Sequence, residues 1–206
     1  MAGTSPLTAS TVPHPRRPLH SGAPRPDRLR DWYENDLGWA TVPEAPGQPV
    51  RLVTGVRFDV LEVPAGAGVR ALRHLAPGSP VALQGGRMRL LVAAGGAEEL
   101  PGLLDWLEWG PAALDLDLRA LGAGGAMDAP ARPGPGRPVQ GAAAWLRPPE
   151  SGCEVEASLP TLSAMGGVKG APDLARLVDT MATECHRVRL RRAEHGPRDN
   201  QALASS

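Results

Sequence analysis

Prolines and glycines set the limits within which this chain can fold. It has 25 glycines and 23 prolines among 206 residues, together about twice the usual share. Residues 1–26 are rich in proline and show no apolar periodicity, and the run 129–138 cannot form a helix or a central strand. Hydrophobic residues nevertheless make up 42% of the chain, which is too many for a wholly disordered protein. We therefore expect a folded domain with a long proline-rich loop and a flexible arm.

The balance of charges disfavours one class of function. The 22 basic and 22 acidic side chains give a formal net charge of zero, so the chain is not expected to bind nucleic acid through bulk charge. Aromatic residues make up only 3% of the chain. This scarcity also disfavours a nonspecific single-strand binder, because such proteins need stacking platforms beside a positive groove. The core must then consist of Leu, Val and Ala, with five tryptophans as its large anchors.

The sequence shows no membrane or secretion signal and few cysteines. No stretch of about 18 apolar residues occurs, and the N-terminus lacks the pattern of a secretory signal. We expect a cytoplasmic protein that makes no use of a membrane. Cys153 and Cys185 are isolated, whereas a disulfide framework or a zinc site needs more cysteines at closer spacing. Cys185 and His186 are neighbours on an expected helix and point in different directions, which argues against a Cys–His dyad.

Three parts are expected along the chain. Residues 1–26 form a mildly basic arm, which is either a solvated tail or a contact for an acidic partner or phosphates. Residues 27–192 form one domain in which helices and strands mix. This pattern predicts an α+β fold, with a mixed or antiparallel sheet and flanking helices. Residues 193–206 are expected to be a flexible tail.

Hydrophobic periodicity predicts the elements of this domain. Apolar residues at offsets of zero, three, four and eight from Leu29 share one helical face. The residues Gln-Gly-Gly-Arg at 84–87 separate two apolar runs and predict a β-hairpin. Leucines that alternate with Asp115 and Asp117 predict a half-exposed strand. The expected helices are 27–37, 69–75, 100–107 and 174–192, and the expected strands are 39–42, 56–63, 81–83, 88–93, 113–118 and 142–146.

Four segments resemble, in order, a known family. Asp31–Pro43 is similar to the opening of bacterial primase-polymerase domains of the archaeo-eukaryotic primase superfamily, where an aromatic-containing helix runs into Gly-Trp and a short strand ending in Pro. Thr54–Pro64 looks like the family's strand with its first metal-binding acids. Gln84–Leu91 is similar to the Gly-Gly-Arg-His hairpin that contacts a nucleotide phosphate, and Leu116–Trp145 follows the order of the segment with the third acid. The resemblance covers most of residues 31–145.

The resemblance implies nucleotidyl transfer and a set of site residues. Polymerases of this kind use two metal ions held by converging carboxylates. The matching positions make Glu62 and Asp117 the candidate catalytic acids, and Arg87 and Arg119 the candidate phosphate-binding residues. Mg²⁺ or Mn²⁺ would be the cofactor of an active protein.

This chain departs from the family's pattern at two positions. Pro64 stands where the second acid of the pair is expected, and proline offers no side-chain oxygen. Asp59 cannot replace that acid, because residues three apart on a strand point to opposite faces unless a bulge intervenes. Met88 stands where the family has its histidine, and a thioether cannot donate a hydrogen bond. We therefore expect no efficient nucleotidyl transfer.

Each candidate residue also has a simpler structural interpretation. Glu62 and Asp117 can be surface carboxylates on strands, and Arg87 can be a surface arginine instead of a phosphate contact. Asp115 is the alternative to Asp117, since the two would share one face of a strand at positions i and i+2. If a metal binds, we expect its ligands among Glu62, Asp115 and Asp117.

Two functions from different classes follow. The first is a primase-polymerase-like domain with degenerate catalysis that still holds a nucleotide or a nucleic-acid strand in a groove between two sheet regions. The alternative is a noncatalytic regulatory or scaffolding protein that meets a protein partner. Its contact surface would be Trp106–Trp109 or the arginine-rich end of the last helix, because Trp and Arg are favoured at interface hot spots.

Overall fold

The computed structural model describes residues 26–43, 48–134, 140–162 and 173–195. The arm expected at 1–26 therefore lies almost entirely outside the described residues, as do most of the expected C-terminal tail and the glycine-rich segment 163–172. The helices are α1 (Pro26–Asp31), which continues into a π-helical turn at Trp32–Asp36, α2 (Ala65–Ala71), α3 (Gly96–Trp106) and α4 (Leu174–His195). The strands are β1 (Arg51–Val53), β2 (Asp59–Pro64), β3 (Val81–Gln84), β4 (Arg87–Val92), β5 (Arg119–Leu121), β6 (Ala126–Asp128) and β7 (Ala144–Arg147).

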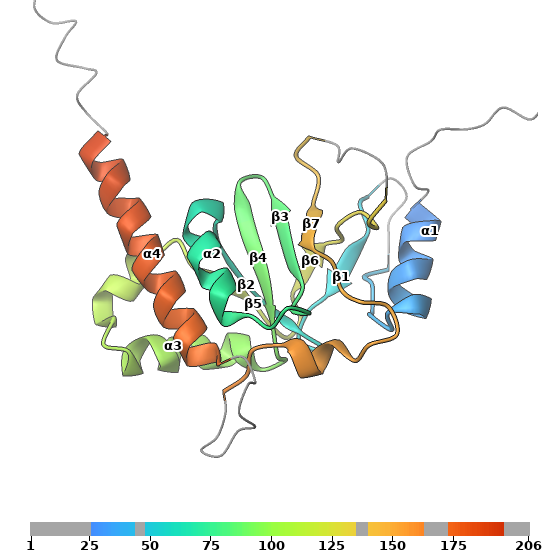
Figure 1. The fold of residues 1–206 in the computed structure, drawn as a ribbon, viewed down its shortest axis with the longest axis horizontal. Helices are drawn as coiled ribbons and strands as arrows, with labels where there is room; N and C mark the ends of the chain where they lie inside the picture. The colour runs from blue at the N-terminus through green and yellow to red at the C-terminus, as the bar shows by residue number, and fades with distance from the viewer. Residues whose placement is uncertain (1–25, 44–47, 135–139, 163–172, 196–206) are drawn as a thin grey trace, which may run out of the picture.

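The strands form two antiparallel sheets. Five of them pair in the order β5-β2-β4-β3-β7, and β1 pairs with β6 in a separate two-stranded ribbon. Helices α2, α3 and α4 lie on one side of the five-stranded sheet, while the ribbon and α1 lie on the other side (Figure 1). This arrangement confirms an α+β fold with an antiparallel sheet and flanking helices.

The central sheet separates two hydrophobic cores. Successive side chains of a strand point to opposite faces, and both faces of β2 and β4 are covered. One face carries Leu61 and Leu90 against α2, α3 and α4. The other carries Val60 and Leu91 against an aromatic group from the N-terminal part of the chain. That aromatic group consists of Trp32, Tyr33, Trp39 and Phe58.

The expected hairpin and the expected last helix are both present. Gly85 and Gly86 connect β3 to β4 with φ angles of 54° and 80°, as a two-residue type I′ turn requires. Helix α4 begins after Asp173, whose carboxylate accepts the Ala175 N–H at 2.9 Å and so caps the helix. It continues to His195, three residues past the expected domain boundary.

Two expected strands are wrong, and three strands, β1, β5 and β6, were not expected. Residues 39–42 form only an isolated bridge between Thr41 and Leu52, and the strand that they accompany, β1, was not expected. Residues 110–115 form a 3₁₀ helix where a strand was expected. The alternation of leucine and aspartate there has another cause than a strand. Leu116 packs into the core between the sheet and helices α2, α3 and α4, which we call the helix-side core. The two aspartates form ion pairs with arginines of α4 and β4.

No helix within the described ranges is both long and apolar enough to cross a membrane. The two cysteines are free: Cys153 is exposed and Cys185 is buried.

Tyr33 ties together three segments that are distant in the sequence. Its buried hydroxyl donates a hydrogen bond to the Pro130 carbonyl at 2.7 Å and accepts one from Trp145 Nε1 at 3.0 Å. Burial raises the pKa of Tyr33, so the hydroxyl keeps its proton and its role as a donor. The π-helical turn, the segment after β6, and β7 are thus joined at one atom.

Removing this hydroxyl is expected to destabilise the fold measurably. Tyr33→Phe keeps the ring but leaves a carbonyl and an indole N–H without their partner, at a cost of about 1–3 kcal/mol. Urea denaturation followed by circular dichroism measures the difference in the free energy of unfolding. An unchanged unfolding midpoint would mean that water replaces the hydroxyl at no cost, and that this junction contributes little.

Candidate functional site

A group of polar side chains occupies one end of the aromatic face of the central sheet. Glu62 of β2 lies directly opposite Arg89 of β4, and Arg87 shares a face with Arg89 because the two are separated by one residue. Gln84 of β3 lies opposite Arg87. We call these four residues, together with Asp117 and Arg119, the polar sheet face.

Glu62 is held between two arginines. It is only 7% exposed, so its interpretation as a surface carboxylate is wrong. Its Oε1 accepts a hydrogen bond from Arg87 Nε at 2.5 Å, and its Oε2 accepts one from Arg89 Nε at 2.7 Å. Both carboxylate oxygens are therefore already occupied by charged donors.

The two aspartates do not form the expected pair on one strand face. Asp117 Oδ1 accepts from Arg87 Nη1 at 2.7 Å, which brings Asp117 to the same guanidinium as Glu62. Asp115 ends the 3₁₀ helix, is exposed, and pairs with Arg189 of α4 at 2.9 Å. Glu62, Arg87 and Asp117 thus lie together, whereas Asp115 pairs with a different arginine.

The same network extends to the two-stranded ribbon through residues that the sequence did not single out. Arg89 also donates to the side-chain oxygen of Gln84. Gln84 Nε2 in turn donates to Asp128 Oδ2 on β6 at 2.7 Å, and Asp128 lies 3.9 Å from Arg51 on β1. The alternation of Arg87 and Arg89 on one strand was a usable signal. Nothing in the sequence points to Asp128, because its partner Gln84 is 44 residues away along the chain.

The arginines determine the charge state of Glu62. Burial disfavours its charged form, but the hydrogen bonds and charges of Arg89 and Arg87 outweigh burial and lower the pKa of Glu62. Burial likewise opposes the charge of Arg87, yet its bonds to Asp117 and Glu62 raise the pKa of that guanidinium. Glu62 and Arg87 are therefore both charged at neutral pH.

The lowered pKa predicts how stability depends on pH. A carboxyl whose pKa is lower in the folded state stabilises the fold fully above its unfolded value of about 4.5, and this contribution is lost as pH falls through the folded value. We expect wild type to be more stable than Glu62→Gln at pH 7, and the difference between them to shrink at pH 3.5. Denaturant titrations of both proteins at the two pH values measure this. A difference that stays constant would contradict ionic pairing of Glu62.

Arg119 is the arginine of this face that has no partner among the described residues. It lies on β5 directly opposite Glu62 and is exposed. Within the described part of the chain it makes no hydrogen bond and no ion pair. An exposed guanidinium of this kind keeps all its donors available for an external anion.

A hollow between the two-stranded ribbon and β5 has Leu121, but not Arg119, in its lining. Its volume is about 460 Å³, and its lining comes from β1, β5, β6 and the segment before β1. The lining residues are Val42, Pro43, Arg51, Val53, Leu121, Gly124, Gly125 and Ala126. Leu121 and Arg119 share one face of β5, since they are two residues apart. The volume is in the range of small-molecule sites.

The carboxylates do not fit a two-metal centre. Such a centre needs converging carboxylate oxygens that are free to bind cations, and those of Glu62 accept arginine hydrogen bonds. In the described ranges, no three His, Cys, Asp or Glu side chains lie close enough to hold a metal ion. Pro64 pairs with Arg87 in the regular ladder of β2 and β4, so no bulge brings another acid into place.

Asp59 and Met88 both belong to the helix-side face of the sheet. Asp59 is buried, and its Oδ2 accepts the Ala97 N–H at 2.9 Å near the start of α3. Burial raises the pKa of Asp59. Met88 is packed in the helix-side core, so the position where the family has its histidine points away from Glu62. The expectation that Asp59 and Glu62 face opposite sides is confirmed.

No protein-family model, curated protein or solved structure matches this chain. The resemblance to primase-polymerase domains consequently stays a prediction from its four segments. A fold alone does not define a function. We therefore infer the function from the chemistry of the polar sheet face.

Nucleophilic catalysis by cysteine finds no support in the geometry. Burial raises the pKa of Cys185 to about 12, so the thiol is neutral at physiological pH and a poor nucleophile. Its Sγ lies 3.8 Å from the Asp117 carbonyl, and His186 instead meets the ring of Trp109 edge-on. The two residues have different environments, as expected for neighbours on a helix.

Proposed function

We propose that this chain is a noncatalytic phosphate-binding domain with the organisation of a primase-polymerase. It holds a nucleotide, or the end of a nucleic-acid strand, without transferring nucleotides. The observation that supports this function is the state of Glu62, whose two oxygens accept hydrogen bonds from Arg87 and Arg89.

The charge of the polar sheet face favours an anion over a cation. Arg87, Arg89 and Arg119 lie there with two carboxylates, Glu62 and Asp117. Arg192 of α4 approaches Asp117 at 3.9 Å and adds a fourth positive charge. The surplus is positive, and guanidinium groups match the geometry of phosphate oxygens. Arg119 can bind such a group without giving up an existing partner.

The hollow between the sheets supplies a place for the rest of a nucleotide. It lies on the side of β5 that carries Arg119, and most of its lining is apolar. A phosphate at Arg119 and a base in the hollow would use neighbouring parts of one surface. We take this surface as the candidate for the groove between two sheet regions that the sequence predicts.

Catalysis would require the network to be rebuilt. A cation that bound Glu62 would first have to break two charge-assisted hydrogen bonds, and these are the strong class of hydrogen bond. Mg²⁺ or Mn²⁺ would therefore serve only as a counter-ion that enters with a nucleoside triphosphate.

Loss of Arg119 is expected to weaken phosphate binding. A hydrogen bond to a charged group contributes about 1.5–3 kcal/mol, so Arg119→Ala should raise the Kd for a labelled nucleoside triphosphate by about tenfold or more. Arg28→Ala is the matched control, because Arg28 is also exposed but lies on α1. Equal binding by wild type and both variants would contradict a phosphate site at Arg119.

Primer synthesis and extension assays with Mg²⁺ or Mn²⁺ test the absence of catalysis. We expect no product above the level of a no-protein reaction. Extension that disappears in Asp117→Ala would show an active nucleotidyltransferase and would refute the noncatalytic part of this function. Binding without extension is the expected combination.

A second function has one specific observation in its favour. Trp106 is 73% exposed, whereas Trp109 is half-buried and contacts His186. A scaffolding contact would therefore use Trp106. Recovery of the same binding partners by wild type and Trp106→Ala would refute it. The cytoplasmic location stays a prediction from the sequence.

A further inference from the structure

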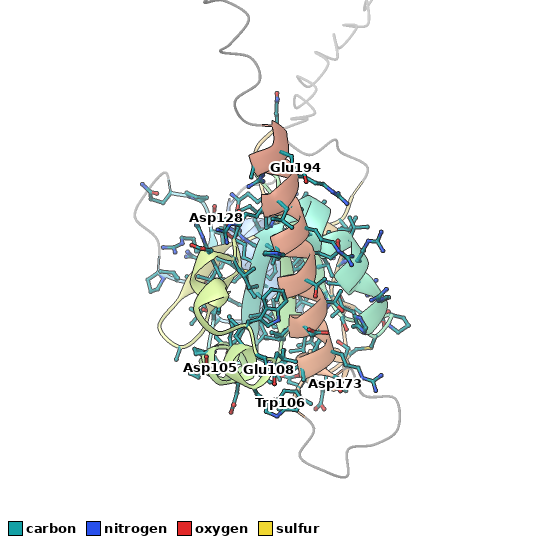
Figure 2. All side chains as sticks on the ribbon, turned by 90° about the vertical axis from the view of Figure 1, so that its left-hand side faces the viewer. Asp105, Trp106, Glu108, Asp128, Asp173 and Glu194 are labelled. Atoms are coloured by element: carbon teal, nitrogen blue, oxygen red, sulfur yellow. The ribbon has the colours of Figure 1, made fainter. Side chains whose placement is uncertain are left out.

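A large aromatic side chain and two carboxylates are exposed together at the end of α3. Trp106 is the most exposed of the large hydrophobic residues in the described part of the chain, at 73%. Figure 2 shows Asp105, Trp106 and Glu108 together at the lower end of the molecule. We call Asp105, Trp106 and Glu108 the α3-end surface.

Neither carboxylate of this surface has a partner among the described residues. Asp105 and Glu108 are both exposed, and neither side chain forms a hydrogen bond or an ion pair there. Glu108 also has a φ of 62°, in a region where glycine is the usual residue after a helix. A residue with a side chain costs about 1 kcal/mol in that conformation. The local backbone would therefore favour glycine, yet the chain has a glutamate there.

The part of the chain around this surface carries acidic but no basic side chains. Residues 90–118 contain six acidic side chains and no Lys, Arg or His. Two of the six, Asp115 and Asp117, are neutralised by arginines from other elements. Asp105 and Glu108, beside the exposed indole, have no such arginine among the described residues.

The N-terminal arm has the complementary chemistry. Residues 1–25 contain Arg16, Arg17 and Arg25 but no Asp or Glu. Pro15 and Pro18 flank the two adjacent arginines. Proline-rich segments bind exposed aromatic rings in an extended, preformed conformation, and arginine adds ion pairs with carboxylates and stacking on indole. A Pro-Arg-Arg-Pro segment therefore fits a tryptophan between two acids.

We propose that the α3-end surface binds the Pro15–Pro18 segment of a second copy of this chain. The contact is independent of the phosphate site proposed on the polar sheet face. It is not symmetric, because the arm of one molecule meets the helix end of the next. Contacts of this head-to-tail kind produce rings or open chains.

The position of the arm favours a second copy over the same molecule. Arg17 precedes Pro26 by nine residues, which span about 28 Å in an extended proline-rich segment. The arm enters the fold at α1, and Figure 1 shows α1 and α3 on opposite sides of the central sheet. A domain of this size is about 40 Å across, so the arginines of one arm cannot pass around the domain to their own α3.

Sedimentation of the full-length chain over a range of concentrations tests this contact. We expect association that rises with concentration and weakens with added salt, because ion pairs at a surface are screened. The variants Arg16→Glu/Arg17→Glu and Asp105→Arg/Glu108→Arg should each raise the dissociation constant by about tenfold or more, because like charges would then oppose one another. Arg28→Glu, a charge reversal outside the arm, should leave association unchanged.

Mixing the two double variants gives the decisive comparison. Each alone should be monomeric, but a mixture restores opposite charges between different molecules and should associate. Trp106→Ala should weaken association while all charges remain. A monomeric wild type, an association that both double variants retain, or a mixture that stays monomeric would each overturn the proposal. A monomer whose Trp106 is shielded from a fluorescence quencher by its own arm would overturn the assignment to a second copy.

Discussion

Gly55→Ala is expected to remove a large part of the stability of this protein. A Cβ at this position would lie 2.2 Å from Ala123 Cα and 2.6 Å from Ala123 N. Those are backbone atoms, and the loop that contains them is held in place by a 3.0 Å hydrogen bond that the Thr54 N–H donates to the Gly125 carbonyl. Gly55 also has a φ of 84°, which disfavours any other residue. The clash and the strain together should cost about 4 kcal/mol or more, a large part of the typical stability of a domain.

Gly85→Ala separates the two causes. Gly85 also has a positive φ, of 54°, but a Cβ there would meet nothing within 4 Å. This variant should lose about 1 kcal/mol from backbone strain alone. Thermal and denaturant unfolding of both proteins measures the two losses. Similar losses would mean that strain dominates and that the loop can move away from Gly55.

The second large effect is expected at Glu62. Glu62→Ala leaves Arg87 and Arg89 largely buried without the carboxylate that accepts both of their Nε hydrogen bonds. Removal of one partner from a buried charge cluster is strongly destabilising, here by about 3 kcal/mol. Denaturant unfolding at pH 7 measures the loss.

Glu156→Ala is the matched control for this change. Glu156 also accepts a short hydrogen bond from an arginine, Arg57 Nε at 2.6 Å, but both side chains are much more accessible to water. The loss of an accessible ion pair is expected to cost less than about 1 kcal/mol. If the two variants lose the same stability, burial of the Glu62 cluster contributes nothing.

Glu62→Ala also distinguishes the two chemical roles considered for this carboxylate. Without Glu62, two guanidinium groups become available, so binding of inorganic phosphate or a nucleoside triphosphate should strengthen while stability falls. A metal ligand behaves in the opposite way, because its removal weakens binding of a metal-bound nucleotide. Tighter phosphate binding by the less stable variant would support the phosphate-binding function, and weaker binding would refute it.

Local patterns predicted those parts of the fold that depend on near neighbours. The Gly85–Gly86 turn, the two strands that it joins and the apolar face of α4 all follow from residues a few positions apart. The placement of Asp59 and Glu62 on opposite faces of β2 also follows from strand geometry alone. These predictions are confirmed because no tertiary contact competes with them.

Contacts between distant segments decided what the sequence could not. The alternation around Asp115 and Asp117 fits a strand. In the structure, however, Asp115 pairs with Arg189 of α4 and Asp117 pairs with Arg87 of β4. The short strand β1 forms because β6, 75 residues later, pairs with it. Its residues have no distinctive periodicity, so no local pattern could predict it.

By itself the sequence determined the fold class, the hairpin and the last helix, and it singled out Glu62, Arg87 and Asp117 as candidates. Only the tertiary structure decided that Arg89 completes the cluster, that Asp115 lies elsewhere, and that Arg119 has no partner among the described residues. The physical reason is the separation along the chain over which each kind of interaction acts. Backbone preferences act over a few residues, whereas the state of a charged side chain depends on which charges the finished fold brings within hydrogen-bond distance.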